Sequence, residues 1–145
     1  MLHEPATIRR MYREELTLST QGETDIVDIT DDVRDIATRS AQREGTIHVF
    51  TPGATAGITT IEFEPGCVAD LKAAFERVAP RHGDYDHNRR WGDGNGFSHV
   101  RAAMLGPSLS VPLDDGVPML GTWQQIILVD FDNKRRNRRV VVTVS

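Results

Sequence analysis

The C-terminal stretch LGTWQQIILVDFDNKRRNRRVVVTVS, residues 120–145, decides the predicted fold. Two runs rich in β-branched residues, which favour strands, lie on either side of a cationic segment. That segment, KRRNRR at 134–139, holds five cations in six residues and predicts a solvated hairpin turn that keeps a sheet edge soluble. Anion binding is the alternative interpretation of so dense a positive charge.

Further strands and two helices precede this stretch without regular alternation. Residues 12–20 alternate polar and apolar side chains, as a strand with one solvated face does. One helix is predicted within residues 29–45, ending at a Gly45 cap, and another within residues 65–80, with a buried face made of Val68, Leu71, Phe75 and Val78. The pattern favours an α+β fold: a single compact domain over residues 1–145, with a mostly antiparallel sheet and two main helices.

The composition narrows the classes of protein to consider. The chain has 145 residues and a formal net charge of −4, which argues against non-specific nucleic-acid binding as its main role. Its one cysteine allows no internal disulfide and suits a reducing compartment, so we expect a cytoplasmic protein. No apolar run approaches the roughly 20 residues that span a bilayer, so we expect no membrane association.

Three short patterns could carry chemistry outside the longest polar stretch. The segment TPGATAG, residues 51–57, could hold a phosphate on the backbone N–H groups near Gly53 and on the Thr55 hydroxyl, or it could be a tight turn. Glu62 lies on a predicted strand, either as a base or metal ligand or on a solvated face. Gln124 follows Trp123 and could bond across the sheet or to a ligand.

The stretch YDHNRRWGDGNGFSHVRAAMLG, residues 85–106, is predicted to be a long polar loop. His87, Asp93, Asn95 and His99 fall within it, and imidazole with carboxylate suits a divalent metal or acid–base catalysis near neutral pH. The spacing matches neither a specific zinc motif nor an EF-hand. A structured turn and an active-site loop both stay open on spacing alone.

Three blocks in one order resemble the YjbQ family, also called UPF0047 or secondary thiamine-phosphate synthase. The blocks are PGATAGITTIEFEPG, then DHNRRWGDGNGFSHVRAAMLGPSLSVPL, then LGTWQQIILVDFDNKRRNRRVVV, and the resemblance covers about residues 12–145. It implies a compact α+β domain that assembles as a homotrimer. It also implies a transferase that joins a pyrimidine-methyl diphosphate to a thiazole phosphate and releases pyrophosphate, normally with Mg²⁺. Many members carry a histidine where this chain has Gly53.

The resemblance also assigns expected roles to individual residues. Glu62, Asn95 and His99 are the expected catalytic residues. A phosphorylated ligand is expected on a second set: Gly53, Thr55, Asp93 and Gln124. His87 and His99 are candidate ligands for a divalent metal, Mg²⁺ or Zn²⁺. A trimeric, non-enzymatic binding protein for a phosphorylated metabolite and a metal-dependent hydrolase are the alternative functions.

Overall fold

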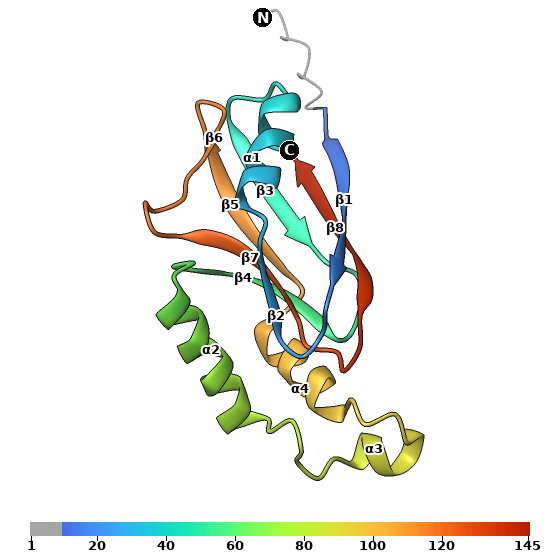
Figure 1. Ribbon diagram of the computed structural model, residues 1–145. Helices are drawn as coiled ribbons and strands as arrows, with labels where there is room; N and C mark the ends of the chain where they lie inside the picture. Colours follow the sequence, from blue (N-terminus) through green and yellow to red (C-terminus); the bar gives the residue numbers. More distant parts are fainter. Residues whose placement is uncertain (1–9) are drawn as a thin grey trace, which may run out of the picture.

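The computed structural model describes residues 10–145, which form eight strands and four helices (Figure 1). The elements follow one another in the order β1 (Tyr12–Thr20), β2 (Asp25–Asp28), α1 (Thr30–Arg39), β3 (Gly45–Phe50), β4 (Ala56–Ile61), α2 (Pro65–Val78), α3 (Asp86–Trp91), α4 (Gly96–Leu105), β5 (Ser108–Asp114), β6 (Val117–Pro118), β7 (Gln125–Asp130) and β8 (Arg136–Val144).

The strands form two antiparallel sheets. One sheet has the order β1-β8-β3-β5-β6 and the other the order β2-β7-β4. The α+β class and the antiparallel pairing predicted from the sequence are confirmed. The four helices of residues 10–145 exceed the two that were expected.

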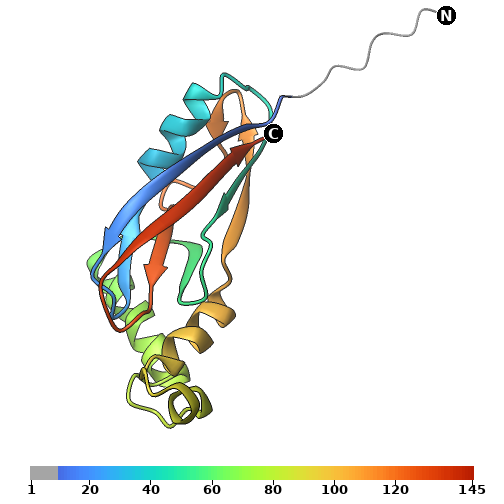
Figure 2. The same cartoon turned by 90° about the vertical axis from the view of Figure 1, so that its right-hand side faces the viewer.

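The predicted hairpin between the last two strands is wrong, because β7 and β8 lie in different sheets. β7 pairs with β2 and β4, whereas β8 pairs with β1 along its full length and with β3. The chain between them therefore crosses from one sheet to the other (Figure 2). Of the cationic segment, Lys134 and Arg135 are exposed in this crossing, but Arg136 and Arg138 belong to β8 itself.

Two apolar cores stabilise the layers. The larger lies between the sheets and includes Val33, Ile36 and Ala37, which form the buried face of α1. The smaller lies on the other side of β7, where Ile127, Val129 and Phe131 meet α2 and α4. β7 is thus buried on both faces, which explains its continuous apolar run.

Details of the helices differ from the sequence prediction. α1 ends at Arg39, and Gly45 instead begins β3 with φ +137°, where an added Cβ would stand 2.3 Å from the Ser145 carbonyl oxygen. Pro65 does occupy the first turn of α2, but none of its side chains is fully buried, and Val78 is 59% exposed. The outer face of the smaller core is therefore only partly covered within one chain.

The polar stretch 85–106 is mostly helical rather than a loop. Gly92, with φ +71°, ends α3, and Asn95 precedes the first residue of α4. Arg101 of α4 is buried and donates hydrogen bonds to the Ala79 carbonyl, Thr24 and Glu76, at 2.7 to 2.9 Å. These bonds fix α4 against the end of α2. The helical pattern was missed because glycine and polar residues at 92–96 obscured the periodicity.

Candidate functional site

The candidate site lies where β7 ends, β4 begins and the first turn of α4 approaches them. Asp130 and Asp132 are fully buried at the end of β7, and Thr55 and Arg138 are each at least nine-tenths buried. The Phe131 amide donates to the Thr55 carbonyl at 2.9 Å, which joins the segment before β4 to the end of β7. Buried charges require partners, so the side chains of this cluster must be held by one another.

Arg138 connects two of these residues, Asp130 and Thr55. Its Nε and Nη2 donate to the two carboxylate oxygens of Asp130, both at 2.8 Å, as a bidentate pair. The same Nη2 donates to Thr55 Oγ1 at 2.6 Å. Thr20 also donates to Asp130. The segment that carries Gly53 and Thr55 is therefore held by charge-assisted hydrogen bonds and is not a free turn.

Asp132 forms the second carboxylate of the cluster. It accepts hydrogen bonds from Arg136 Nε at 2.8 Å, from the Asn133 amide at 2.8 Å and from Thr55 Oγ1 at 3.2 Å. Burial would raise the pKa of Asp132, but hydrogen bonds from Asn133, Asn95 and Arg136 together outweigh burial and lower it. Asp132 is therefore a stable anion at neutral pH.

The Asn95 amide lies between two carboxylates. In one orientation its nitrogen donates to Asp132 Oδ1 at 3.3 Å, and after a flip the amide donates to Asp93 Oδ1 at 3.1 Å. His87 Nδ1 stands 3.4 Å from Asp93 Oδ1, and the His87 and His99 rings lie 4.4 Å apart, centroid to centroid. The predicted residues Asp93, Asn95, His87 and His99 are thus brought together, and the Asn95 amide bonds to either Asp93 or Asp132 according to its orientation.

The environment of His99 favours its neutral form. Burial is the largest cause that lowers its pKa from the usual value of 6.5, and the neighbouring His87 lowers it further, against the opposing effects of Asp132 and Asp93. A neutral imidazole can accept a proton or a hydrogen bond. His99 lines a hollow of about 250 Å³ together with Gly53, Ala54, Ala56, Ala102, Ala103 and Pro107.

Glu62 and Gln124, by contrast, lie at the opposite end of β4 and β7. Ala56 pairs with Asp130 at the site, whereas Ile61 pairs with Gln125 at the far end. At about 3.3 Å per residue, roughly 20 Å of strand separates Glu62 from Thr55. Glu62 lines a shallow hollow with Phe63, Glu64 and Trp123, and Gln124 Nε2 donates to Thr60 Oγ1 at 3.2 Å. Within one chain the expected site residues form two groups.

A metal site finds little support in the arrangement of side chains. Within residues 10–145, no three His, Cys, Asp or Glu side chains gather so that they could hold a metal ion. The neighbouring rings of His87 and His99 supply two nitrogen-bearing groups, fewer than the three protein ligands of a typical catalytic zinc site. The described residues therefore do not fit a resident Zn²⁺, and we assign no chemical step to a metal.

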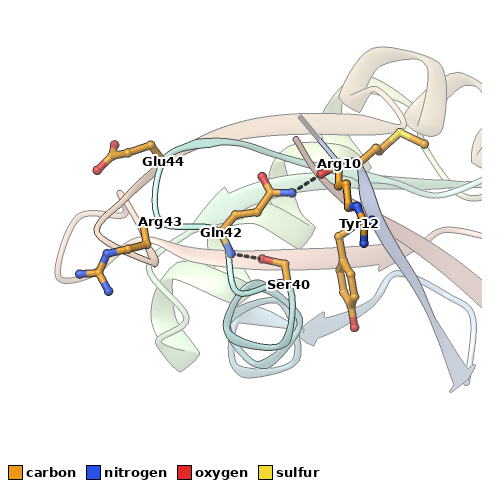
Figure 3. A pocket seen from close by; sticks show the side chains of 7 residues that line it. Arg10, Tyr12, Ser40, Gln42, Arg43 and Glu44 are labelled. Atoms are coloured by element: carbon orange, nitrogen blue, oxygen red, sulfur yellow. Dashed lines mark hydrogen bonds between the residues drawn. The ribbon is translucent and has the colours of Figure 1, made fainter. Parts of the chain in front are cut away.

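A larger hollow, of about 590 Å³, lies far from this cluster, between the start of β1 and the residues that follow α1 (Figure 3). Gln42 Nε2 donates to the Arg10 carbonyl at 2.5 Å across it. Arg43 and Glu44 point away from one another at its rim. It contains neither a histidine nor a cysteine, and its polar groups do not converge on a common point.

The comparisons with known proteins agree with this fold. A family model described as "UPF0047 protein YjbQ-like" matches residues 14–145. This chain belongs to the YjbQ family. It is 44% identical over 117 residues to a UPF0047 protein of Mycobacterium tuberculosis, covering 79% of this chain and 86% of that protein. With a UPF0047 protein of Archaeoglobus fulgidus the identity is 38% over 128 residues, 88% of this chain and 97% of that one.

Solved structures extend the likeness. A YjbQ-like protein of unknown function from Sulfolobus solfataricus superimposes with a TM-score of 0.89 at 30% identity, covering 93% of this chain and 96% of that one. An uncharacterised YjbQ-family protein from Clostridium acetobutylicum gives a TM-score of 0.83 at 34% identity, with coverage of 91% and 99%. These relatives confirm the family and its fold and carry no stated activity.

Sequence reasoning missed Asp130, Asp132 and Arg138. The two aspartates were treated as part of a strand, and Arg138 as part of a solvated turn. A usable signal was present, because Asp130 and Asp132 follow the run IILV directly and a buried carboxylate needs a cation.

No helix in the described part of the chain has the length and apolar character needed to cross a membrane.

Proposed function

We propose that this YjbQ-family protein is a small-molecule transferase of the thiamine-phosphate synthase type. The observation that supports the proposal is that His99 and Gly53 line one hollow, while Thr55, two residues after Gly53, donates to the buried Asp132 and the Asn95 amide lies between Asp132 and Asp93. His99 once protonated by a bound anion, the buried carboxylate and the adjacent backbone together offer a proton donor, an orienting group and hydrogen-bond donors. This is the equipment that a displacement of a phosphorylated leaving group requires.

The proposed substrate position follows from the backbone at residues 53–54. The N–H groups of Gly53 and Ala54 make no hydrogen bond to any other residue in 10–145. Free N–H donors beside a glycine suit the oxygens of a phosphate or diphosphate. Both residues line the hollow that His99 also lines. A diphosphate bound there would therefore lie in the same hollow as the imidazole that is proposed to protonate its leaving oxygen.

The proposed reaction needs one proton and no oxidant. The thiazole nitrogen attacks the methylene carbon of the pyrimidine-methyl diphosphate, a C–N bond forms, and the C–O bond to pyrophosphate breaks with its electron pair on oxygen. Because the bound diphosphate is an anion, it would raise the pKa of His99 and favour the imidazolium. His99 could then donate its proton to the oxygen of the departing pyrophosphate, while the His87 ring packs against the His99 ring.

A second candidate is a binding protein for a phosphorylated metabolite, without turnover. The observation in its favour is that Glu62 lies at the other end of β4 from the hollow that His99 lines. Within a single chain, the predicted catalytic carboxylate therefore cannot act together with the His99 imidazole. The metal-dependent hydrolase is less well supported, because the described residues offer no group of three metal-binding side chains.

A homotrimer would reconcile these observations, and we propose that assembly. If the Glu62 end of one subunit met the His99 end of the next, the two groups of predicted residues would form one site. Apolar side chains favour such an interface near Glu62, since Phe63 is 43% exposed and Trp123 is 71% exposed. The incompletely covered face of α2 is a further surface for a neighbouring copy.

A cytoplasmic location stays a prediction from the single cysteine.

The transferase proposal is tested by purified protein supplied with the two phosphorylated substrates. Thiamine phosphate and pyrophosphate should appear together, and both should fall at least tenfold in His99→Ala and Asn95→Ala. His48→Ala is the matched control, because His48 lies on β3 and bonds to Ser110. Binding of the substrates without any product would favour the binding protein, and no difference between wild type and His99→Ala would exclude the proposed role of His99.

A further inference from the structure

One donor of Arg138 lacks a partner. Nε and Nη2 are used by Asp130 and Thr55, but Nη1 makes no hydrogen bond to any residue in the described range 10–145. The side chain is 9% exposed, and Nη1 is not one of the buried polar atoms without a partner, so Nη1 belongs to the part of the guanidinium that solvent reaches. A charged donor that a ligand can reach, on a guanidinium whose other donors are already held by buried partners, is suited to bind an anion.

The free donor faces the glycine of the TPGATAG segment. A Cβ added at Gly53 would stand 3.2 Å from Nη1, which is the nearest side-chain atom there. Gly53 has φ +139°, a conformation that other residues rarely adopt. The residue therefore leaves bare backbone beside Nη1, and any larger side chain would occupy the space through which a ligand oxygen could reach that nitrogen.

We propose that Arg138 is a phosphate-binding residue, with Nη1 donating to a phosphate oxygen held beside the backbone N–H groups of Gly53 and Ala54. The inference deepens the proposed function and rests on it for the place of the substrate. The bidentate pair with Asp130 fixes the guanidinium plane, so that Nη1 is presented in one direction. Asp130 also balances the charge of Arg138 while the site is empty.

The chemistry explains why this position carries arginine. A lysine could pair with Asp130 or reach a phosphate as a point charge, but the planar guanidinium can do both at once through different nitrogens. The Thr55 hydroxyl accepts from Nη2 at 2.6 Å and donates to Asp132 at 3.2 Å, so its hydrogen is directed away from the hollow. Arg138, rather than Thr55, is therefore the residue that contacts the ligand in this proposal. Thr55 acts as a positioning residue.

The test is binding of pyrophosphate and inorganic phosphate, measured by calorimetry at constant ionic strength. Wild-type protein should bind pyrophosphate, and the double variant Arg138→Met/Asp130→Asn should bind it at least about tenfold more weakly, since a charge-assisted hydrogen bond is lost. The double change avoids an unpaired buried carboxylate. Arg139→Met is the matched control, because Arg139 lies next on β8 but is exposed and paired with Glu15; its affinity should stay within about twofold.

A second measurement keeps the inference testable if the double variant does not fold. In wild-type protein labelled with ¹⁵N-arginine, the side-chain signal of Arg138 should shift as pyrophosphate is added, and that of Arg139 should not. Pyrophosphate binding with an unmoved Arg138 signal, equal binding by the double variant, or no binding by wild type would each overturn the inference. Thiamine phosphate assayed in parallel separates the two proposals: Arg138-dependent binding without product leaves the inference standing and removes the transferase.

Discussion

Arg138 Nη2 lies 2.6 Å from Thr55 Oγ1, although 83 residues separate the two in sequence. The contact joins β8, in the larger sheet, to the residue before β4, in the smaller one. Because the same guanidinium holds both oxygens of Asp130, the relation between the two sheets at this end is fixed by ionic hydrogen bonds as well as by apolar packing. The site therefore lies where the hydrogen bonds of Arg138 join the two sheets.

The first prediction concerns this buried pair. Arg138→Met should lower the free energy of unfolding by roughly 3–5 kcal/mol, because Asp130 is left as a buried and unpaired charge. Adding Asp130→Asn to this variant should recover a large part of the lost free energy of unfolding. Urea denaturation followed by circular dichroism measures both, with Arg139→Met as the exposed control. A single variant as stable as wild type would show that the pair contributes no net stability.

The second prediction is a pH dependence caused by His99. Its folded-state pKa is lowered, so the unfolded chain binds more protons than the folded one as pH falls below about 6.5. Protonation of His99 in acid therefore lowers the free energy of unfolding. This effect disappears once the pH is above the pKa that His99 has in the unfolded chain. The melting temperature of wild type should fall more between pH 7.5 and 5.5 than that of His99→Gln. The variant His82→Gln, at an exposed position, should keep the wild-type slope; equal slopes in all three proteins would contradict the prediction.

The outcome for the sequence-based predictions depended on how local each pattern was. The strand predicted from the run around IILV and the helix predicted within 65–80 follow from neighbouring residues, and they formed over Gln125–Asp130 and Pro65–Val78. The partner of each strand depends on residues far away, which is why the hairpin between β7 and β8 failed. Asn95 and His99 stood out because polar residues crowd their stretch. Arg138 did not, since the cations around it are typical of a solvated turn, and only the buried aspartates reveal its role.

The third prediction addresses assembly. Trp123 is 71% exposed and stands beside Phe63 in the hollow that Glu62 lines, so Trp123→Ser should weaken the proposed trimer and shift the mass in solution toward the monomer. Light scattering after size-exclusion chromatography measures this shift over a range of concentrations. Trp91→Ser is the control, since Trp91 is 67% exposed on α3, away from that hollow. A wild-type protein that is monomeric throughout would remove the trimer.

The fourth prediction concerns the two groups of residues that a single chain keeps about 20 Å apart along β4. If a site combines the Glu62 end of one subunit with the His99 end of another, Glu62→Ala and His99→Ala should each abolish formation of thiamine phosphate. Co-expression of the two variants should then restore part of it, because some interfaces of a mixed assembly contain Glu62 from one chain and His99 from the other.

The control for this experiment is a mixture of His99→Ala with the double variant Glu62→Ala/His99→Ala, which contains no intact His99 and should stay inactive. Mass spectrometry of the intact complex establishes that mixed assemblies formed. If mixed assemblies are present and activity does not return, Glu62 and His99 do not act across an interface. Should Glu62→Ala alone keep full activity, the carboxylate has no part in the reaction, and the site consists of the His99 end alone.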